Sequence, residues 1–360
     1  MIALIFIGLP LLGILAYFKY NRQFGGKLTS SHIEEYSNSP HWNGKKFVNA
    51  VPTSMDLSVK DMPKLIREQF RKDANREPEA PLPIAAFDLH SFQSTSEFTY
   101  IWYGHSAFLM KMNGITFAID PMMGPDAAPI GPMRTKRFSE NTLDIIDHWP
   151  NLDAVLYTHD HYDHLDYASI QKLKQKVGHW YVALGVGRHL ERWGISPSSI
   201  TEMDWWDDAT LGDIQLTFTP SRHFAGRGPT DRAKSFWGGW VLKTSKESVY
   251  FTGDGGYAGH FEEVGKRLGP FDICFTECGQ YNEKWRPIHM FPEESVQAAT
   301  ESQSNKAVPY HWGGFRLALH PWTEPVERFI DHANAENLQY QLPKLGAINT
   351  LNDGNSKPWW

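Results

Sequence analysis

A dense cluster of metal-binding side chains follows a short apolar run near the middle of the chain. The run Ala154–Tyr157 predicts a buried strand, and the segment Tyr167–Lys176 predicts a helix. The loop between them offers four candidate ligands within six residues: His159, His161, Asp163 and His164. Imidazoles and carboxylates are the groups that zinc and related divalent ions bind. Because a strand-to-helix loop lets such side chains converge, this stretch predicts a metal site.

Composition limits the class of protein. The chain has 360 residues, of which 41% are hydrophobic, which suffices for one large domain with an extension. The net charge of -6 gives no basic surface for nucleic acid, so a nucleic-acid partner is not expected. The two cysteines, Cys274 and Cys278, are too few for a disulfide framework and are expected to be packed in the interior.

The N-terminus predicts a membrane helix. Ile2–Phe18 is apolar and uncharged, and as a helix it would span roughly 26 Å at about 1.5 Å per residue. Lys19, Arg22 and Lys27 follow it, so we expect residues 1–18 to be an uncleaved anchor with the catalytic domain on the cytoplasmic side. A cleaved signal and a monotopic or partner-binding helix are the alternatives.

Four segments are expected along the chain. Residues 19–90 form a polar arm, with a helix at Met62–Arg71 and a proline-rich stretch near its end. Residues 91–345 form the main domain, and residues 346–360 form a C-terminal tail.

The main domain predicts an α/β fold with two packed sheets and helices outside. The turn Asn113-Gly114 predicts a hairpin. The expected strands are Tyr100–Met110, Ile115–Ile119, Ala154–Tyr157, Trp180–Leu184, Ile214–Thr219, Gly239–Lys243, Ser248–Thr252 and Asp272–Thr276. The expected helices are Tyr167–Lys176, Gly187–Trp193, Phe261–Leu268 and Glu293–Gln303.

Three later residues complete the candidate metal site. His223, Asp254 and His311 each follow an apolar run soon after it ends, as His159 does. If these strands share a sheet edge, all seven groups meet on one side of the molecule. Each of the three is weak alone, because a single histidine after a strand is more often a hydrogen-bonded structural group.

The chain resembles the metallo-β-lactamase superfamily, through the motif His159-x-His161-x-Asp163-His164 and the order of the later ligands. Within it, the chain is similar to the N-acyl-phosphatidylethanolamine phospholipase D family and its bacterial relatives over about residues 98–320. The residues that carry this are Trp102 to Ser106, Asp120-Pro121, Gly131-Pro132, Arg137-Phe138, His223 to Gly228, Trp237 to Trp240, Gly253 to Tyr257, His289 to Glu294 and His311 to Gly313. Ser106-Ala107 and Gly314 depart from that family's pattern without touching a ligand.

The resemblance implies an αβ/βα sandwich of two mixed sheets with two Zn²⁺ ions at one edge. It assigns the first ion to His159, His161 and His223, and the second to Asp163, His164 and His311. Asp254 would bridge the two ions. This agrees with a count of the residues themselves, since three ligands each and one shared carboxylate leave an open position on both ions.

The resemblance further implies a zinc phospholipase D that gives phosphatidic acid and an N-acylethanolamine. A metal hydroxide would attack phosphorus. His289 is the candidate proton donor to the leaving group, or else an ordinary surface residue, and Asp163 is counted among the catalytic groups as well. His105 and Asp120 are expected to orient ligands, although Asp120 could instead cap a turn before Pro121. Arg222 could hold a phosphate or pair with an acid.

Other functions stay open. A lactonase or a small-molecule phosphodiesterase could use the same site, and a membrane-tethered metal-binding protein without turnover is a remote alternative. The expected partners are a phospholipid or other phosphodiester, the membrane and, as relatives suggest, a second copy of the chain in a homodimer. Aromatic residues near the ligand loops, such as Trp205-Trp206 and Phe224, could wall an acyl pocket or simply fill the core.

Overall fold

Two seven-stranded sheets form the centre of the molecule. The computed structural model describes residues 13, 16–17, 20–54, 63, 67–68, 75–128, 134–354 and 358–360. The first sheet has the order β14 (Ile348–Thr350), β1 (Thr99–Trp102), β2 (Phe108–Met112), β3 (Ile115–Ile119), β4 (Leu152–Tyr157), β5 (Val177–Ala183) and β6 (Ile200–Met203). The second has the order β13 (Gln339–Tyr340), β12 (Lys306–Tyr310), β11 (Ile273–Glu277), β10 (Ser248–Phe251), β9 (Gly239–Lys243), β8 (Ile214–Thr219) and β7 (Asp208–Leu211).

Both sheets are mixed in the same way. In the first, β14, β1, β2 and β3 pair antiparallel, and β3 to β6 pair parallel. In the second, β7 to β10 pair antiparallel, and β10 to β13 pair parallel. Consequently β4 in one sheet, and β8, β10, β11 and β12 in the other, end in loops that can meet at one edge of the sandwich.

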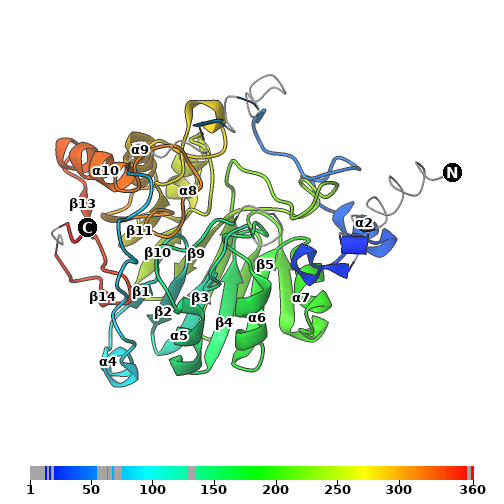
Figure 1. Ribbon diagram of the computed structural model, residues 1–360, viewed down its shortest axis with the longest axis horizontal. Helices are drawn as coiled ribbons and strands as arrows, with labels where there is room; N and C mark the ends of the chain where they lie inside the picture. Colours follow the sequence, from blue (N-terminus) through cyan, green and yellow to red (C-terminus); the bar gives the residue numbers. More distant parts are fainter. Residues whose placement is uncertain are drawn as a thin grey trace.

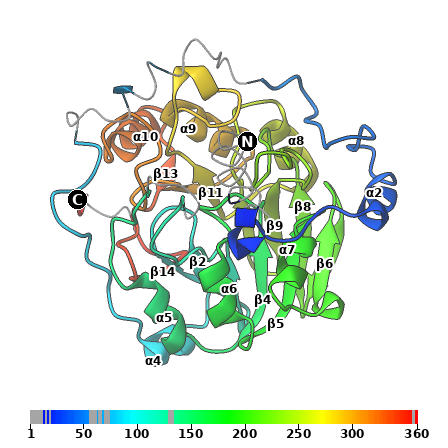
Figure 2. The same cartoon turned by 45° about the vertical axis from the view of Figure 1, so that its right-hand side comes forward.

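Helices cover the outer faces of the two sheets (Figures 1 and 2). On the first sheet these are α5 (Thr142–His148), α6 (Tyr167–Leu173) and α7 (Gly187–Arg192). On the second they are α8 (His260–Leu268), α9 (Pro292–Glu301) and α10 (Glu324–Ala335). In the described part of the chain before β1 lie the helices α2 (Ser30–Tyr36) and α4 (Leu89–Ser94), and single 3₁₀ turns lie at Arg22–Phe24, Pro197–Ser199 and Glu283–Trp285.

The core lies between the sheets and is rich in aromatic rings. Phe108 of β2 is buried, and its ring meets Phe275 of β11 edge to face at 5.0 Å and Phe251 of β10 at 5.6 Å. Such geometry adds to the free energy gained by burying each ring. The α/β sandwich of two mixed sheets with helices outside is therefore confirmed.

Many predicted strands and helices agree with the structure, but one predicted strand near the candidate site is wrong. The Asn113-Gly114 hairpin is confirmed, because both residues have positive φ (48° and 83°) between β2 and β3. The single strand predicted over Tyr100–Met110 is wrong. The chain turns there, with positive φ at Gly104 (86°) and His105 (56°), so β1 and β2 are separate strands. This turn places His105 beside Asp163, with His105 Nε2 2.8 Å from Asp163 Oδ2.

The predicted N-terminal membrane anchor requires correction. Most of residues 1–18 lie outside the described residues, as does most of the helix predicted at Met62–Arg71. In the part of the chain that the structure describes, no helix has the length and apolar character needed to cross a bilayer. A single N-terminal transmembrane helix, and the membrane-bound localisation derived from it, are therefore not supported. The predicted tail, residues 346–360, contributes strand β14.

Candidate metal centre

Asp120 fixes the start of the ligand loop that follows β4. Its two carboxylate oxygens accept hydrogen bonds from the Thr158 backbone N–H (2.8 Å) and the Thr158 hydroxyl (2.6 Å). The Nδ1–H of His164 donates to the same carboxylate at 2.8 Å. Asp120 therefore contacts a predicted ligand and the strand end that carries it, as an orienting role requires.

His159, His161 and His223 form the first group of candidate ligands. His161 Nδ1 lies 2.9 Å from His159 Nε2 and 3.2 Å from His223 Nε2. Burial lowers the pKa of His161 to about 4, and burial together with the neighbouring histidines holds the pKa of His159 and His223 well below the usual value. Three neutral imidazoles that present nitrogen atoms to one another form a donor set for a cation.

Asp163, His164, Asp254 and His311 form the second group. Asp254 Oδ2 lies 3.1 Å from His164 Nε2 and 2.9 Å from His311 Nε2, and Asp163 Oδ2 lies 3.6 Å from His311 Nε2. Burial opposes the charged form of His164, but the carboxylates of Asp254, Asp163 and Asp120 outweigh it and raise its pKa to about 10. These carboxylates, of which Asp120 and Asp254 are buried, require positive charge beside them, which a divalent cation would supply.

Asp254 reaches both groups. One of its carboxylate oxygens lies within 4.8 Å of ligand nitrogens of His159 and His164, and the same limit holds for His223 and His289. Its Oδ1 atom is buried and accepts no hydrogen bond from any residue that the structure describes. An unpaired buried carboxylate oxygen is costly, and a bound cation would remove that cost. The residues therefore fit the metal site predicted from the sequence.

Several candidate ligand histidines are held from behind by hydrogen bonds of the ring nitrogen that faces away from the cluster. His223 donates from Nδ1 to the Ile288 carbonyl (2.8 Å), and His311 donates from Nδ1 to the Gly279 carbonyl (3.3 Å). His105 donates from Nε2 to Asp163 Oδ2 at 2.8 Å, and burial lowers the pKa of His105 to about 3. These hydrogen bonds fix the ring orientation and leave the inward atoms for coordination.

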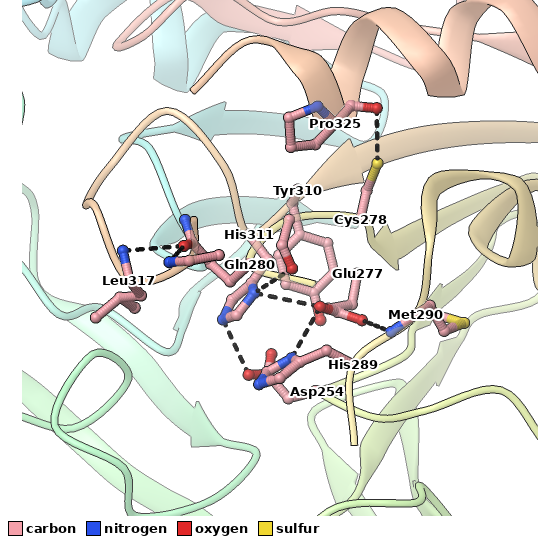
Figure 3. Close-up of polar contacts among 12 residues, drawn as sticks. Asp254, Glu277, Cys278, Gln280, His289, Met290, Tyr310, His311, Leu317 and Pro325 are labelled. Carbon is pink, nitrogen blue, oxygen red and sulfur yellow. Dashed lines mark hydrogen bonds and ion pairs between the residues drawn. The ribbon is translucent and has the colours of Figure 1, made fainter. Parts of the chain in front are cut away.

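Glu277, at the end of β11, was not predicted as a site residue. Its side chain is fully buried, and Oε1 lies 3.0 Å from His289 Nδ1 and 3.3 Å from His311 Nδ1, while Oε2 accepts from the Met290 N–H at 3.0 Å (Figure 3). The predicted proton donor His289 thus lies beside the cluster, with its ring 5.2 Å from that of His311. An acid directly after a predicted strand was the available signal.

Asp160, between two ligands, was also missed. It is buried and accepts hydrogen bonds from the Gly226 N–H (2.7 Å), His189 Nε2 (3.0 Å) and the Ser235 hydroxyl. Arg222 donates to Thr53 Oγ1 and to carbonyl oxygens and makes no ion pair with a described residue, so the predicted pairing with an acid is not seen, and the phosphate role stays a prediction.

The aromatic residues near the loops mostly fill the core. Phe236, Trp237, Trp240 and Trp312 are buried, whereas Phe224 is half-buried and contacts the ring of His161 at 4.6 Å. Cys274 and Cys278 are buried free thiols, so the prediction that they are packed is confirmed.

Comparisons with known proteins agree with this geometry. A family model described as "Beta-lactamase superfamily domain" matches residues 116–312, more than half of the chain. An uncharacterised protein of Mycobacterium tuberculosis is 34% identical over 328 residues, which are 89% of this chain and 87% of the relative. An N-acyl-phosphatidylethanolamine-hydrolyzing phospholipase D of Caenorhabditis elegans is 28% identical over 251 residues, 66% of this chain and 70% of the relative.

A solved structure shares the fold. A metallo hydrolase from the archaeon Ignicoccus hospitalis superposes with a TM-score of 0.54 at 19% identity, over 70% of this chain and 97% of that one. Sandwich fold, candidate metal-binding clusters and sequence relatives thus agree, and the chain belongs to the β-lactamase superfamily, among the metal-dependent hydrolases with the metallo-β-lactamase fold.

Proposed function

We propose that the protein is a two-zinc phosphodiesterase that hydrolyses phospholipids of the N-acyl-phosphatidylethanolamine type. Water and the phosphodiester would give phosphatidic acid and an N-acylethanolamine, with cleavage of the bond between phosphorus and the ethanolamine oxygen. The observation that carries the proposal is the position of Asp254 between two groups of three ligands. The name of the C. elegans relative suggests the lipid.

Each residue of the candidate site has its own role in the proposed reaction. His159, His161 and His223 would hold one ion, Asp163, His164 and His311 the other, and Asp254 would contact both. The ions would supply Lewis acidity and lower the pKa of a bound water. His289 would donate a proton to the departing alkoxide. Since Glu277 binds its Nδ1, Nε2 is the nitrogen left for that transfer.

A cavity beside His223 bears on the size and charge of the substrate. It encloses about 230 Å³, which is below the roughly 300–1,000 Å³ typical of ligand pockets. Lys46 and Arg232 line it, and neither forms an ion pair with a described residue. A cavity of this size and charge suits an anionic head group, so long acyl chains would extend beyond it. The same feature favours the second candidate, a phosphodiesterase for small molecules.

The test compares wild type with Asp254→Asn on N-acyl-phosphatidylethanolamine in detergent micelles, with metal content measured on both. A second substrate keeps the phosphodiester and the N-acylethanolamine but lacks both glycerol acyl chains. Release of phosphatidic acid by wild type alone supports the lipid phosphodiesterase. Turnover of only the deacylated substrate supports the small-molecule enzyme. Full metal occupancy with no turnover of either would sink the phosphodiesterase proposal and direct the search to lactones.

A further inference from the structure

The N-terminal arm touches both loops that carry the first group of ligands, although it lies outside the matched superfamily domain at residues 116–312. Within the arm predicted at residues 19–90, the contacting part is residues 21–53. It makes two separate sets of contacts, one with the loop of His223 and one with the loop of His159 to His164. Neither set was foreseen from the sequence.

The first contact is a pair of hydrogen bonds between Asn49 and the backbone of His223. Asn49 Nδ2 donates to the His223 carbonyl at 2.8 Å, and the His223 N–H donates to Asn49 Oδ1 at 3.1 Å. Trp237 Nε1 donates to the same Oδ1 at 3.1 Å and so fixes the orientation of the amide. The Asn49 side chain therefore pairs with both the N–H and the carbonyl of His223, as the backbone of a neighbouring strand would.

The second contact runs through His189 to Asp160, the residue between His159 and His161. The Gly26 N–H donates to His189 Nδ1 at 3.1 Å, and His189 Nε2 donates to Asp160 Oδ2 at 3.0 Å. Only glycine allows this approach, because a Cβ on Gly26 would lie 2.0 Å from the Arg188 carbonyl oxygen. The arm backbone thus selects the histidine tautomer that donates to Asp160.

Arg227 strengthens this second contact. Its buried guanidinium donates to the carbonyls of Asp160 and Leu165, both at 2.6 Å, and to the arm carbonyl of Gln23 at 2.9 and 3.0 Å. One cation therefore joins the arm to both ends of the ligand loop.

We infer that the N-terminal arm is a positioning element of the metal centre, with Asn49 and Gly26 as its positioning residues. The inference rests on the proposed metal site but not on the proposed lipid. Groups that orient ligand residues without touching the ion typically change metal affinity or activity by about ten- to hundredfold. Asn49→Ala and Gly26→Ala are therefore each expected to weaken Zn²⁺ binding by about that factor.

The experiment measures the Zn²⁺ dissociation constant of the full chain by competition with a chromophoric chelator. It also measures melting temperatures of the metal-free and zinc-loaded protein. Asn38→Ala removes an exposed asparagine of the arm and is the control for Asn49→Ala. Gly259→Ala is the control for Gly26→Ala, because Gly259 has a φ of -65° and a Cβ there would meet nothing within 4 Å.

Both arm variants should lose affinity and show a smaller melting shift on zinc addition, with both controls unchanged. A merely structural arm would lower the metal-free and loaded melting temperatures equally, so the difference between them separates the two roles. Wild-type affinity in both arm variants would overturn this inference alone. Failure of the wild type to bind any Zn²⁺ would overturn the proposed function as well.

Discussion

Glu277 contacts two histidines through one carboxylate oxygen, and this double contact has a kinetic consequence. Glu277→Gln keeps the shape of the side chain but removes the charge that holds both Nδ1–H groups. We expect kcat and kcat/KM to fall together by about ten- to hundredfold, since the proposed proton transfer belongs to the transition state. Rate measurements at several substrate concentrations check this, with the exposed Glu262→Gln as control. An unchanged kcat would contradict the role.

Glu202 makes stability depend on pH. Burial raises the pKa of this carboxyl from 4.5 to about 7, although the backbone N–H groups of Gly185 and Gly187 partly oppose the shift. The folded state then holds a proton that the unfolded state has lost between pH 4.5 and 7, so the free energy of unfolding falls as pH rises through that window. The fall should be about 3 kcal/mol, and Glu202→Gln should abolish it. Urea unfolding at pH 5 and pH 8 checks this, and an equal fall in the variant would contradict it.

Some candidate site residues can be found from their neighbours in the sequence, and others only from contacts made in the fold. His159, His161, Asp163 and His164 could be proposed as ligands because one loop carries them. His223 and Asp254 were proposed because each follows a predicted strand, and His311 because it follows the apolar pair Ala307-Val308. Asn49 could not be predicted, because its partner lies 174 positions away and nothing in the arm's own sequence points to it. Asp160 and Glu277 were visible as acids, but only the fold shows which groups their oxygens contact.

At the scale of elements, most strands and half of the α-helices in the described part of the chain were predicted from the sequence, while short connections were not. Gly104-His105-Ser106 was absorbed into one strand, although glycine followed by histidine is compatible with a turn of positive φ. Helices α2, α4, α5 and α10 were missed, as were the strands β6, β7, β12, β13 and β14. The two sheets share the same mixture of antiparallel and parallel pairs, but no internal repeat in the sequence reveals this likeness.

The hydrogen bonds of Arg227 to the loop of His159 to His164 give a prediction at the scale of elements. Arg227→Met removes the guanidinium and leaves the buried carbonyls of Asp160 and Leu165 without donors. We expect the free energy of unfolding of the metal-free protein to fall by about 2–4 kcal/mol. Urea unfolding compares the variant with Arg267→Met, which removes an exposed arginine on α8. Equal stability of the two variants would show that these hydrogen bonds of Arg227 do not stabilise the fold.

At the scale of the whole molecule, the candidate ligands come from both halves of the sandwich. The loop after β4 belongs to the first sheet, whereas His223, Asp254 and His311 follow strands of the second. Bound metal would therefore hold the sheets together at this edge.

Metal removal should accordingly destabilise the fold. With free Zn²⁺ about 1,000 times above its dissociation constant, binding adds about 4 kcal/mol to the free energy of unfolding. Dialysis against a chelator should lower the melting temperature by several degrees, and Zn²⁺ but not Na⁺ should restore it. Identical melting curves before and after dialysis would contradict a metal centre.

The predicted homodimer and the predicted domain boundaries stay predictions.

The pairing of β14 with β1 also bears on how the protein is made. Thr99 pairs with Thr350, so about 250 residues must be synthesised between the two strands, which takes roughly 10–50 s at about 5–20 residues per second. During that time the nascent chain carries β1, whose four residues are buried in the finished protein, with an unpaired edge. The danger of aggregation is therefore greatest while the chain is being made, before β14 can cover this edge of β1.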